Sequence, residues 1–341
     1  MVQIERTTHS AALHDRDDVV ISSSAGIDHE EQLATRAAWL YFIADNTQSQ
    51  VGKKLGLSRV RVNRLLAHAR KQGLVQINIA GKLANAIILE DKLKQRFGLR
   101  DAVVVPSTPD AQQVRLVIAA AAGQYLGQQL RDGMSVGVGW GQTLRMSLSS
   151  VPHKMFKRLS IVSLIGGLTR SSAVNPHETA SHLADIVGAQ CFYFAGPAFT
   201  DTEATRTVLM NQPMLRDVFE RGSKVDLAFL SVGEMSRTST MAKLGLISPA
   251  EVLSLEQVGA VGDLCSYWMN AKGEVVDHPL NKRAVSLSPQ HLREVKRVVL
   301  VSGGKNKVPM IHGVLHAGYA NIIVTDEATA LSVLNFADKG K

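Results

Sequence analysis

The segment from Ser58 to Gln72, SRVRVNRLLAHARKQ, carries side chains that can hydrogen-bond to the edges of DNA bases. At helical spacing its apolar residues fall on one face, which leaves arginine, asparagine and histidine on the other. An arginine can donate two hydrogen bonds to a guanine edge, and an asparagine can pair in the same way with adenine. The segment therefore predicts a base-reading helix with the outward residues Arg59, Arg61, Asn63, Arg64 and His68.

The net charge of the chain is concentrated around this segment. The formal net charge is +8, and no acidic residue lies between Asp45 and Glu90, where eight of the 38 lysine and arginine residues are found. Outside that window basic and acidic residues are equal in number, at 30 each. A helix face that is merely solvated would not explain this concentration, which is typical of a nucleic-acid-binding module. The further positions expected at the DNA are Thr47, Gln48, Lys53, Lys54, Ser58 and Arg70, of which the lysines and Arg70 suit phosphate contacts.

Two more helices are expected to position the base-reading helix. The first runs from Glu31 to about Asn46, and the second is short, begins after the N-cap Thr47 and ends at Gly56. Ser58 can cap the third, which ends at Gly73 before a short strand over 74–79. This order of helix, glycine-containing turn and helix predicts a helix-turn-helix domain over residues 29–80, after a mobile tail over 1–28. The residues expected to face inward are Leu33, Ala37, Leu40, Tyr41, Ala44, Val51, Leu55, Val62, Leu65, Leu66 and Ala69.

From Leu83 onward, short apolar runs alternate with helical patterns. Examples are the strand-like DAVVVP (101–106) and the helix-like AQQVRLVIAAAAGQYLGQQL (111–130). Apolar strands between helices predict a doubly wound, mainly parallel α/β domain over residues 81–341. One antiparallel excursion is expected around LCSYWMNAKGEVVDHPL (264–280), with a turn from Asn270 to Gly273.

Four of the expected strands end in glycine or polar loops, over 137–143, 165–172, 230–236 and 301–307. In doubly wound sheets, ligands bind where the carboxyl ends of the strands meet. Glycines let the backbone approach a ligand, and a helix that starts there presents N–H groups to an anion. Gln142 and Thr143 stand at one such helix start, and Lys305 and Lys307 stand at another. These loops predict a site for a small anionic or polyhydroxylated ligand, and they match neither an ATPase P-loop nor the dinucleotide-binding spacing.

The remaining polar candidates are ambiguous or structural. Asp263 either accepts hydrogen bonds from sugar hydroxyls or caps a turn, and Asp326 is interpreted as an N-cap. His177, Glu178, His182 and Asp185 share one helix, but their spacing is not that of a zinc site, so no metal is expected. His312 and His316 are interpreted as structural or solvated, and Cys191 and Cys265 as small buried residues.

Composition indicates a globular protein. The 341 residues are 45% hydrophobic and 20% charged, and no apolar run approaches the roughly 18 residues that span a bilayer. The N-terminal stretch has no secretory pattern, so a cytoplasmic location without a membrane partner is expected. No cofactor and no catalytic residue are predicted.

Taken together, TQSQVGKKLGLSRVRVNRLLAHARKQGLV, VGVGWGQTL, LIGGLTRSSAVNPHETASHLAD, AVGDLCSYWMNAKGE and SGGKNKVPMIHGVLHAGYANIIVTDEATA resemble the SorC-type family of sugar-responsive bacterial transcriptional regulators. The resemblance extends from about Glu31 to Leu334. It implies an effector domain similar to sugar-phosphate isomerases and glucosamine-phosphate deaminases. By motif position it implies ligand contacts from Gly139, Gly141, Gln142, Thr143, Gly166, Gly167, Leu168, Asp263 and Lys307, and the third and fourth glycine loops add Gly233 and Gly304.

The chain departs from the family pattern at two positions. Gln142 replaces a small hydroxyl residue that often precedes the threonine, and Arg170 follows the double glycine by three positions. The effector is therefore a phosphorylated sugar, a free polyol or a ketose.

The sequence predicts a DNA-binding regulator of a carbohydrate or polyol catabolic operon. Its expected partners are double-stranded operator DNA, a small effector and further copies of itself in a dimer or tetramer. The alternative is a sugar-phosphate isomerase or deaminase-like enzyme with an added basic domain, in which Asp263 would shuttle a proton. The sequence leaves open the effector, the operator, the sign of regulation, the oligomer size and which helix residues contact bases.

Overall fold

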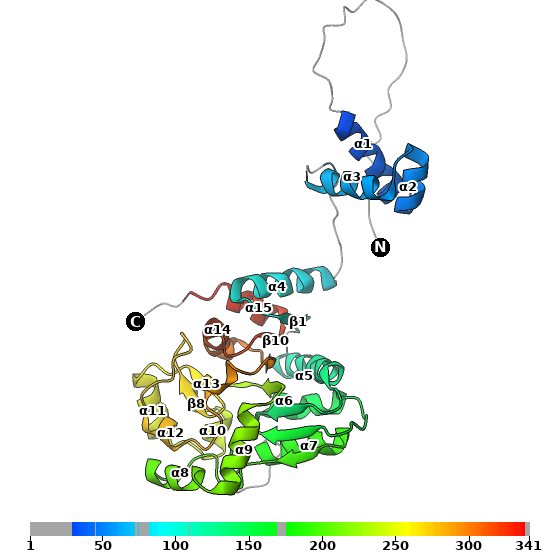
Figure 1. Cartoon of the computed structure of the whole chain (residues 1–341). Helices are drawn as coiled ribbons and strands as arrows, with labels where there is room; N and C mark the ends of the chain where they lie inside the picture. The colour runs from blue at the N-terminus through cyan, green and yellow to red at the C-terminus, as the bar shows by residue number, and fades with distance from the viewer. Residues whose placement is uncertain are drawn as a thin grey trace, which may run out of the picture. The chain divides into compact units, whose positions relative to one another are not determined.

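A computed structural model of the chain describes residues 29–44, 46–71, 74, 82–108, 110–168 and 175–337. The expected tail over 1–28, the expected helix end at Gly73 and the expected strand over 74–79 lie outside these residues, apart from Leu74. The chain divides into two compact units, Met1–Gly81 and Lys82–Lys341, and each is described by itself (Figure 1).

The first unit is helical. Its elements are α1 (His29–Ala38), a π-helical turn η1 (Trp39–Ile43), α2 (Gln48–Leu55) and α3 (Arg59–Lys71). Their shared core contains the small and aliphatic side chains Ala34, Ala37, Ala38, Val51, Val62, Leu65, Leu66 and Ala69.

Local capping explains where α2 and α3 begin. Thr47 forms a capping box with Gln50, in which the Thr47 hydroxyl accepts from the Gln50 N–H (3.3 Å) and the Thr47 N–H donates to the Gln50 side chain (2.8 Å). Gly56, at φ +67°, ends α2 in the left-handed conformation. The Ser58 hydroxyl then accepts from the Arg61 N–H (3.2 Å). All three of these expectations from the sequence are confirmed.

The expected first helix is wrong in its second half. The α-helix ends at Ala38 and continues as a π-helical turn, and Ala44 is exposed instead of facing inward. The Asn46 side chain donates to the carbonyls of Leu40 (3.0 Å) and Ala44 (2.9 Å). These bonds satisfy backbone acceptors that a longer α-helix would have paired internally.

The second unit is built on a seven-stranded sheet of entirely parallel neighbours in the order β1-β10-β9-β5-β2-β3-β4. The strands are β1 (Asp101–Val105), β2 (Ser135–Val138), β3 (Ser160–Ser163), β4 (Gln190–Phe192), β5 (Leu227–Leu230), β9 (Val298–Val301) and β10 (Ile322–Asp326).

Side chains alternate between two cores along the central strands. In β5, Leu227 and Phe229 join a core with α5 (Ala111–Gln129), α6 (Gln142–Ser147) and α7 (Pro176–Val187). Ala228 and Leu230 join the opposite core, with α4 (Lys82–Phe97), α9 (Pro213–Ser223), α14 (Val308–His316) and α15 (Glu327–Leu334). Helices therefore cover both faces, and the predicted doubly wound α/β fold is confirmed.

A small antiparallel sheet, β6 (Val232–Glu234), β7 (Gly262–Leu264) and β8 (Tyr267–Met269), forms the expected excursion. The turn at Asn270–Gly273 is present, and the Gly273 N–H donates to the Asn270 carbonyl (3.0 Å). The hairpin turn between β7 and β8, however, is formed by Cys265 and Ser266, which have φ values of +52° and +66°. The primed turn this requires carries no glycine or asparagine here, so the usual composition rule did not reveal it.

The helices that the sequence pattern did not reveal are short or poorly buried. They are α8 (Glu203–Met210), α10 (Thr240–Lys243), α12 (Pro279–Arg283) and α13 (Pro289–Leu292), whereas α11 (Pro249–Gln257) was expected. No residue of α8 is fully buried. Within the described residues, none of the helices is both long and apolar enough to cross a membrane.

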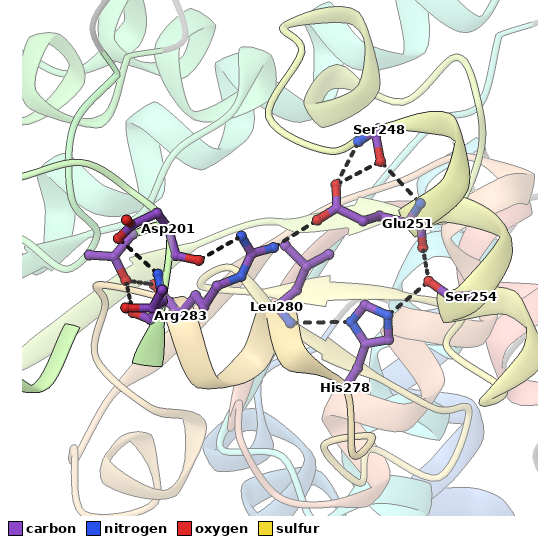
Figure 2. A network of polar contacts seen from close by, with 9 residues as sticks. Asp201, Ser248, Glu251, Ser254, His278, Leu280 and Arg283 are labelled. Carbon is purple, nitrogen blue, oxygen red and sulfur yellow. Dashed lines mark hydrogen bonds and ion pairs between the residues drawn. The ribbon is translucent and has the colours of Figure 1, made fainter. Parts of the chain in front are cut away.

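A polar network ties α11 to α12 (Figure 2). Arg283 donates to Glu251 (2.7 Å), and Glu251 also accepts from the backbone and hydroxyl of Ser248 (2.8 and 2.9 Å). His278 Nδ1 accepts from the Leu280 N–H (3.2 Å), which caps α12, and its Nε2 lies 2.9 Å from the Ser254 hydroxyl. The cap requires a neutral imidazole, because a protonated ring has no acceptor.

Acid is expected to weaken this part of the fold. Burial lowers the pKa of His278, while Glu251 and Asp277 raise it and Arg283 lowers it further. Because the folded-state pKa is below the unfolded value of about 6.5, the stabilisation is present above that pH and is lost as the pH falls below it. We expect the urea concentration at the midpoint of unfolding to decrease when the pH is lowered from 7.5 to 5.5. Loss of the cap should lower the free energy of unfolding by about 1 kcal/mol.

His278→Asn is the matched control for this prediction. An asparagine can cap α12 but does not titrate, so the variant should lose less stability than the natural chain over the same pH interval. Equal losses in the two proteins would show that His278 does not carry the pH dependence.

Candidate functional site

The carboxyl ends of β2, β5 and β9 meet at the point where the strand order reverses. β2 and β5 are hydrogen-bonded neighbours, yet the chain passes through β3 and β4 before it returns to β5. The loops that follow two such strands diverge and leave a crevice, which is where doubly wound sheets bind ligands. A cavity of about 320 Å³ lies there, lined by Arg115, Trp140, Gly141, Gln142, Thr143, Ser231, Val232, Gly233, Glu234, Thr238, Ser239, Thr240, Met241, Lys243, Leu244, Asp263 and Lys307.

Asp263 is the most buried charged group of this lining, at 3% exposure. It lies in the middle of β7 rather than at a strand start, and its Oδ2 accepts from the Ser266 N–H (3.1 Å). Its Oδ1 lies 1.9 Å from the place that a Cβ on Gly233 would occupy, so only glycine at 233 leaves room for the carboxylate. Burial raises the pKa of Asp263 to about 6, against the opposing effects of the Ser266 N–H and, more weakly, of Lys307. The carboxylate can therefore accept hydrogen bonds from hydroxyls at neutral pH.

Lys307, which is half-buried, supplies a cation to the site. It is the last residue of the 3-10 turn η3 (Lys305–Lys307) and occupies the N-cap position of α14, at the helix start that the sequence predicted. Burial lowers the pKa of the Lys307 ammonium, while Glu234 and Asp263 raise it and Arg115 lowers it. An anionic ligand would compensate the unfavourable burial of this ammonium group.

Arg115 reaches the rim of the cavity from α5. Its Nη1 donates to the Gln142 side-chain oxygen (2.5 Å). Gln142 thus orients a cation at the cavity. Thr143, 7% exposed, lies next to it.

A second cavity, of about 640 Å³, adjoins the first and shares four residues with it, namely Arg115, Thr143, Glu234 and Lys307. Gly304, at φ +107°, and the exposed Lys305 belong to this second cavity alone. The two lysines of this loop therefore differ in their position: Lys307 lines both cavities, whereas Lys305 lines only the second.

The structure brings six of the expected ligand residues together at the first cavity: Gly141, Gln142, Thr143, Gly233, Asp263 and Lys307. Gly139, Gly166, Gly167 and Leu168 are not among the residues that line either cavity.

The glycines away from the cavities serve close packing. A Cβ on Gly166 would lie 2.3 Å from the Pro197 carbonyl oxygen, and one on Gly167 would lie 2.3 Å from the His177 ring. Gly139 packs in the same way against Leu230. Leu168 is bonded through its carbonyl to the Asn175 side chain (3.1 Å), and Arg170 lies outside the described residues.

Several lining residues were not identified from the sequence, namely Arg115, Trp140, Ser231, Val232, Glu234, Thr238, Ser239, Thr240, Met241, Lys243 and Leu244. Trp140 and Glu234 stand inside glycine loops that the sequence did single out. Arg115 lies on a helix far from those loops in sequence, and no local pattern indicates that it reaches them.

Other expectations are settled by single contacts. Asp326 is an N-cap, as expected, because its side chain accepts from the Thr329 N–H (3.2 Å). Cys265 is buried, whereas Cys191 is half-buried. His177 stacks against Tyr193, with ring centroids 4.6 Å apart.

In the first unit, the α3 residues Arg59, Asn63 and Arg64, which the sequence predicts to contact DNA, are exposed, and His68 is half-buried. Arg61 forms an ion pair with Glu30 of α1, and Arg59 Nε donates to the Gln48 side chain (3.4 Å). Lys53 and Lys54 are exposed on α2. Thr47 and Ser58 use their hydroxyls as caps, and the Arg70 side chain lies outside the described part of the chain.

The chain is similar to a known domain family and to several known regulators. The family model described as "Putative sugar-binding domain" matches residues 82–335. The erythritol catabolism regulatory protein EryD of Brucella abortus is 32% identical over 309 residues, which cover 90% of this chain and 98% of that protein. The deoxyribonucleoside regulator of Bacillus subtilis is 31% identical, with the same coverage. The full-length sorbitol operon regulator SorC from Klebsiella pneumoniae superposes with a TM-score of 0.70 at 26% identity, over 90% of this chain and 99% of that one.

Proposed function

Because the chain belongs to the SorC-type family of sugar-responsive transcriptional regulators, we propose that its first unit reads operator DNA and that its second unit binds the controlling effector. It is a regulator of carbohydrate or polyol catabolism. We assign the DNA-binding domain to residues 29–80 and the effector domain to residues 81–341.

The effector site proposed is the cavity at the β2–β5 crevice. The observation that carries this assignment is a pair of opposite charges in one small cavity, the buried carboxylate of Asp263 and the half-buried Lys307. Carboxylates accept from the hydroxyls of a sugar or polyol, and the Lys307, Arg115 and Lys243 cations suit a phosphate or another anionic group. Trp140 adds an apolar wall against which carbon-bound hydrogens can pack.

The DNA-binding face proposed is the outer side of α3, with Lys53 and Lys54 of α2 at the phosphates. Assembly into a dimer or tetramer would link several reading heads and raise the affinity through effective concentration. The DNA-binding domains of such an assembly could adopt one arrangement that fits the operator and another that does not. An effector that binds one arrangement more tightly than the other would change the affinity for DNA, by a coupling free energy that is typically ~1–3 kcal/mol.

The relatives named above are regulators, and we propose that the effector is bound without being converted. Isomerases and deaminases need a positioned proton shuttle beside the sugar carbonyl. Among the described residues that line the first cavity, none is a histidine, and Asp263 already accepts from a backbone N–H. Turnover of an aldose or ketose phosphate that is lost in Asp263→Asn would contradict this proposal.

A thermal-shift screen of the full chain against free and phosphorylated sugars and polyols tests the effector site. A ligand that binds only the folded state must raise the melting temperature, by an amount that corresponds to ~2.7 kcal/mol at a hundredfold excess over Kd. We expect at least one hit, and we expect Asp263→Asn to reduce its shift.

The type of hit decides the ligand class. A sugar phosphate would support phosphate binding by Thr143 and Lys307, whereas a free polyol would retire that role and leave hydroxyl recognition by Asp263. Absence of any shift across the screen would contradict the proposed effector site.

A further inference from the structure

The outer face of α3 carries one large apolar side chain among its polar ones. Val60, the second residue of the helix, is 64% exposed. Asn63, Arg64 and Ala67 are exposed on the same face, three, four and seven residues further on. Val62, Leu65, Leu66 and Ala69 fill the core from the opposite face. Val60 therefore lies at the N-terminal end of the outermost stripe.

Contacts within the unit set this stripe apart from the flanking arginines. Arg61 is ion-paired with Glu30 from the beginning of α1, and its side chain is 42% exposed. Arg59 is bonded to Gln48 at the beginning of α2. Both arginines are thus oriented toward neighbouring helices, while Val60, Asn63 and Arg64 project between them.

Helix stability does not explain a valine at this position. β-branched residues are slightly poorer helix formers than alanine, lysine or glutamine, and an exposed valine gains nothing from burial in the free protein. A valine that projects from the N-terminal part of a base-reading helix would, however, lie where such helices meet base edges in the major groove. The apolar group that the major groove offers is the 5-methyl group of thymine.

We propose that Val60 contacts a thymine 5-methyl group in the operator, beside the base pairs read by Asn63 and Arg64. This inference rests on the proposed DNA-binding function. It adds a specificity-determining residue that forms no hydrogen bond, and it predicts that a thymine is required next to the positions that the polar side chains read.

The experiment first uses the full-length chain to select duplexes from a random library. Each thymine of the selected duplex is then replaced by uracil, which removes only the methyl group. In each half of the selected duplex, replacement of one particular thymine by uracil should reduce the affinity of the natural chain about fourfold. This is the loss expected for one methyl-sized group that is no longer withdrawn from water. Val60→Ala should lose about the same on the thymine duplex and should bind the thymine and uracil duplexes equally well.

Ile43→Ala is the matched control, because Ile43 is an exposed apolar residue of the same unit (48%) that lies on η1 and not on α3. It should keep the natural uracil profile. The melting temperature of Val60→Ala should equal or slightly exceed that of the natural chain, since Val60 is not part of the core and alanine is the better helix former.

Two results would overturn the inference. In the first, replacement of each thymine by uracil has the same effect on the natural chain and on Val60→Ala. In the second, the melting temperature of Val60→Ala is lowered, which would assign the side chain to packing. Either would leave the DNA-binding function standing. Failure of the natural chain to select any duplex would overturn the proposed function itself.

Discussion

Arg64→Ala is expected to weaken binding to the selected operator duplex by roughly 1–3 kcal/mol, the value of one bidentate contact to a guanine edge. Arg64 is exposed on the outer face of α3, and its positive charge has no acidic residue near it in sequence. Affinities for the selected duplex and for variants at each base pair, measured at one salt concentration, test this prediction.

The pattern of loss separates base reading from phosphate contact. Loss of a base contact relaxes the preference at one base pair, whereas loss of a phosphate contact weakens binding to all sequences alike. A uniform loss in Arg64→Ala would therefore contradict its role as a reader. Effector binding should not change.

Two further arginines serve as comparisons for Arg64. Arg36→Ala, an exposed residue of α1, should have little effect on operator affinity. Arg61→Ala should have a smaller effect than Arg64→Ala, because the ion pair with Glu30 already engages the Arg61 guanidinium. The sequence alone made Arg61 and Arg64 equivalent candidates, and this intramolecular contact distinguishes them.

Lys307→Met is expected to reduce affinity for a phosphorylated effector by roughly 1.5–3 kcal/mol, the range for a hydrogen bond to a charged group. Lys307 is half-buried and lines both cavities. Titration calorimetry of a phosphorylated hit and of its dephosphorylated analogue should show that the variant has lost the preference for phosphate.

Lys305→Met is the matched control, since it lies in the same turn but is exposed and belongs only to the second cavity. It should retain most of the affinity. The free Lys307→Met protein is expected to be less stable than the natural chain, because the buried Asp263 carboxylate loses a compensating positive charge. The calorimetry is therefore made at a temperature at which the variant is folded, and an unchanged preference for phosphate there would remove Lys307 from the site.

The sequence determined those features that depend on residues close together along the chain. The capping box at Thr47 and Gln50, the left-handed Gly56, the Ser58 cap and the inward face of α3 all form within a few residues of one another. Alternation of apolar strands and helices was sufficient to predict the parallel sheet, because each strand and helix carries its own period. The resemblance to the family then identified the motifs at the strand ends.

Tertiary structure decided which of those motifs meet. Gly141, Gly166 and Gly233 all follow strands, yet Gly141 and Gly233 line the cavity while Gly166 makes room for the Pro197 carbonyl. The difference arises because β2 and β5 flank the crevice at which the strand order reverses.

The same holds for contacts between distant residues. Arg115 reaches Gln142 across 27 residues, and Glu30 holds Arg61 across 31. Neither contact has a local sequence pattern, since side chains so far apart meet only after the elements that carry them have packed. The physical reason is that hydrogen bonds within a helix or turn are encoded by neighbouring residues, whereas the approach of two separate elements depends on the packing of the whole core.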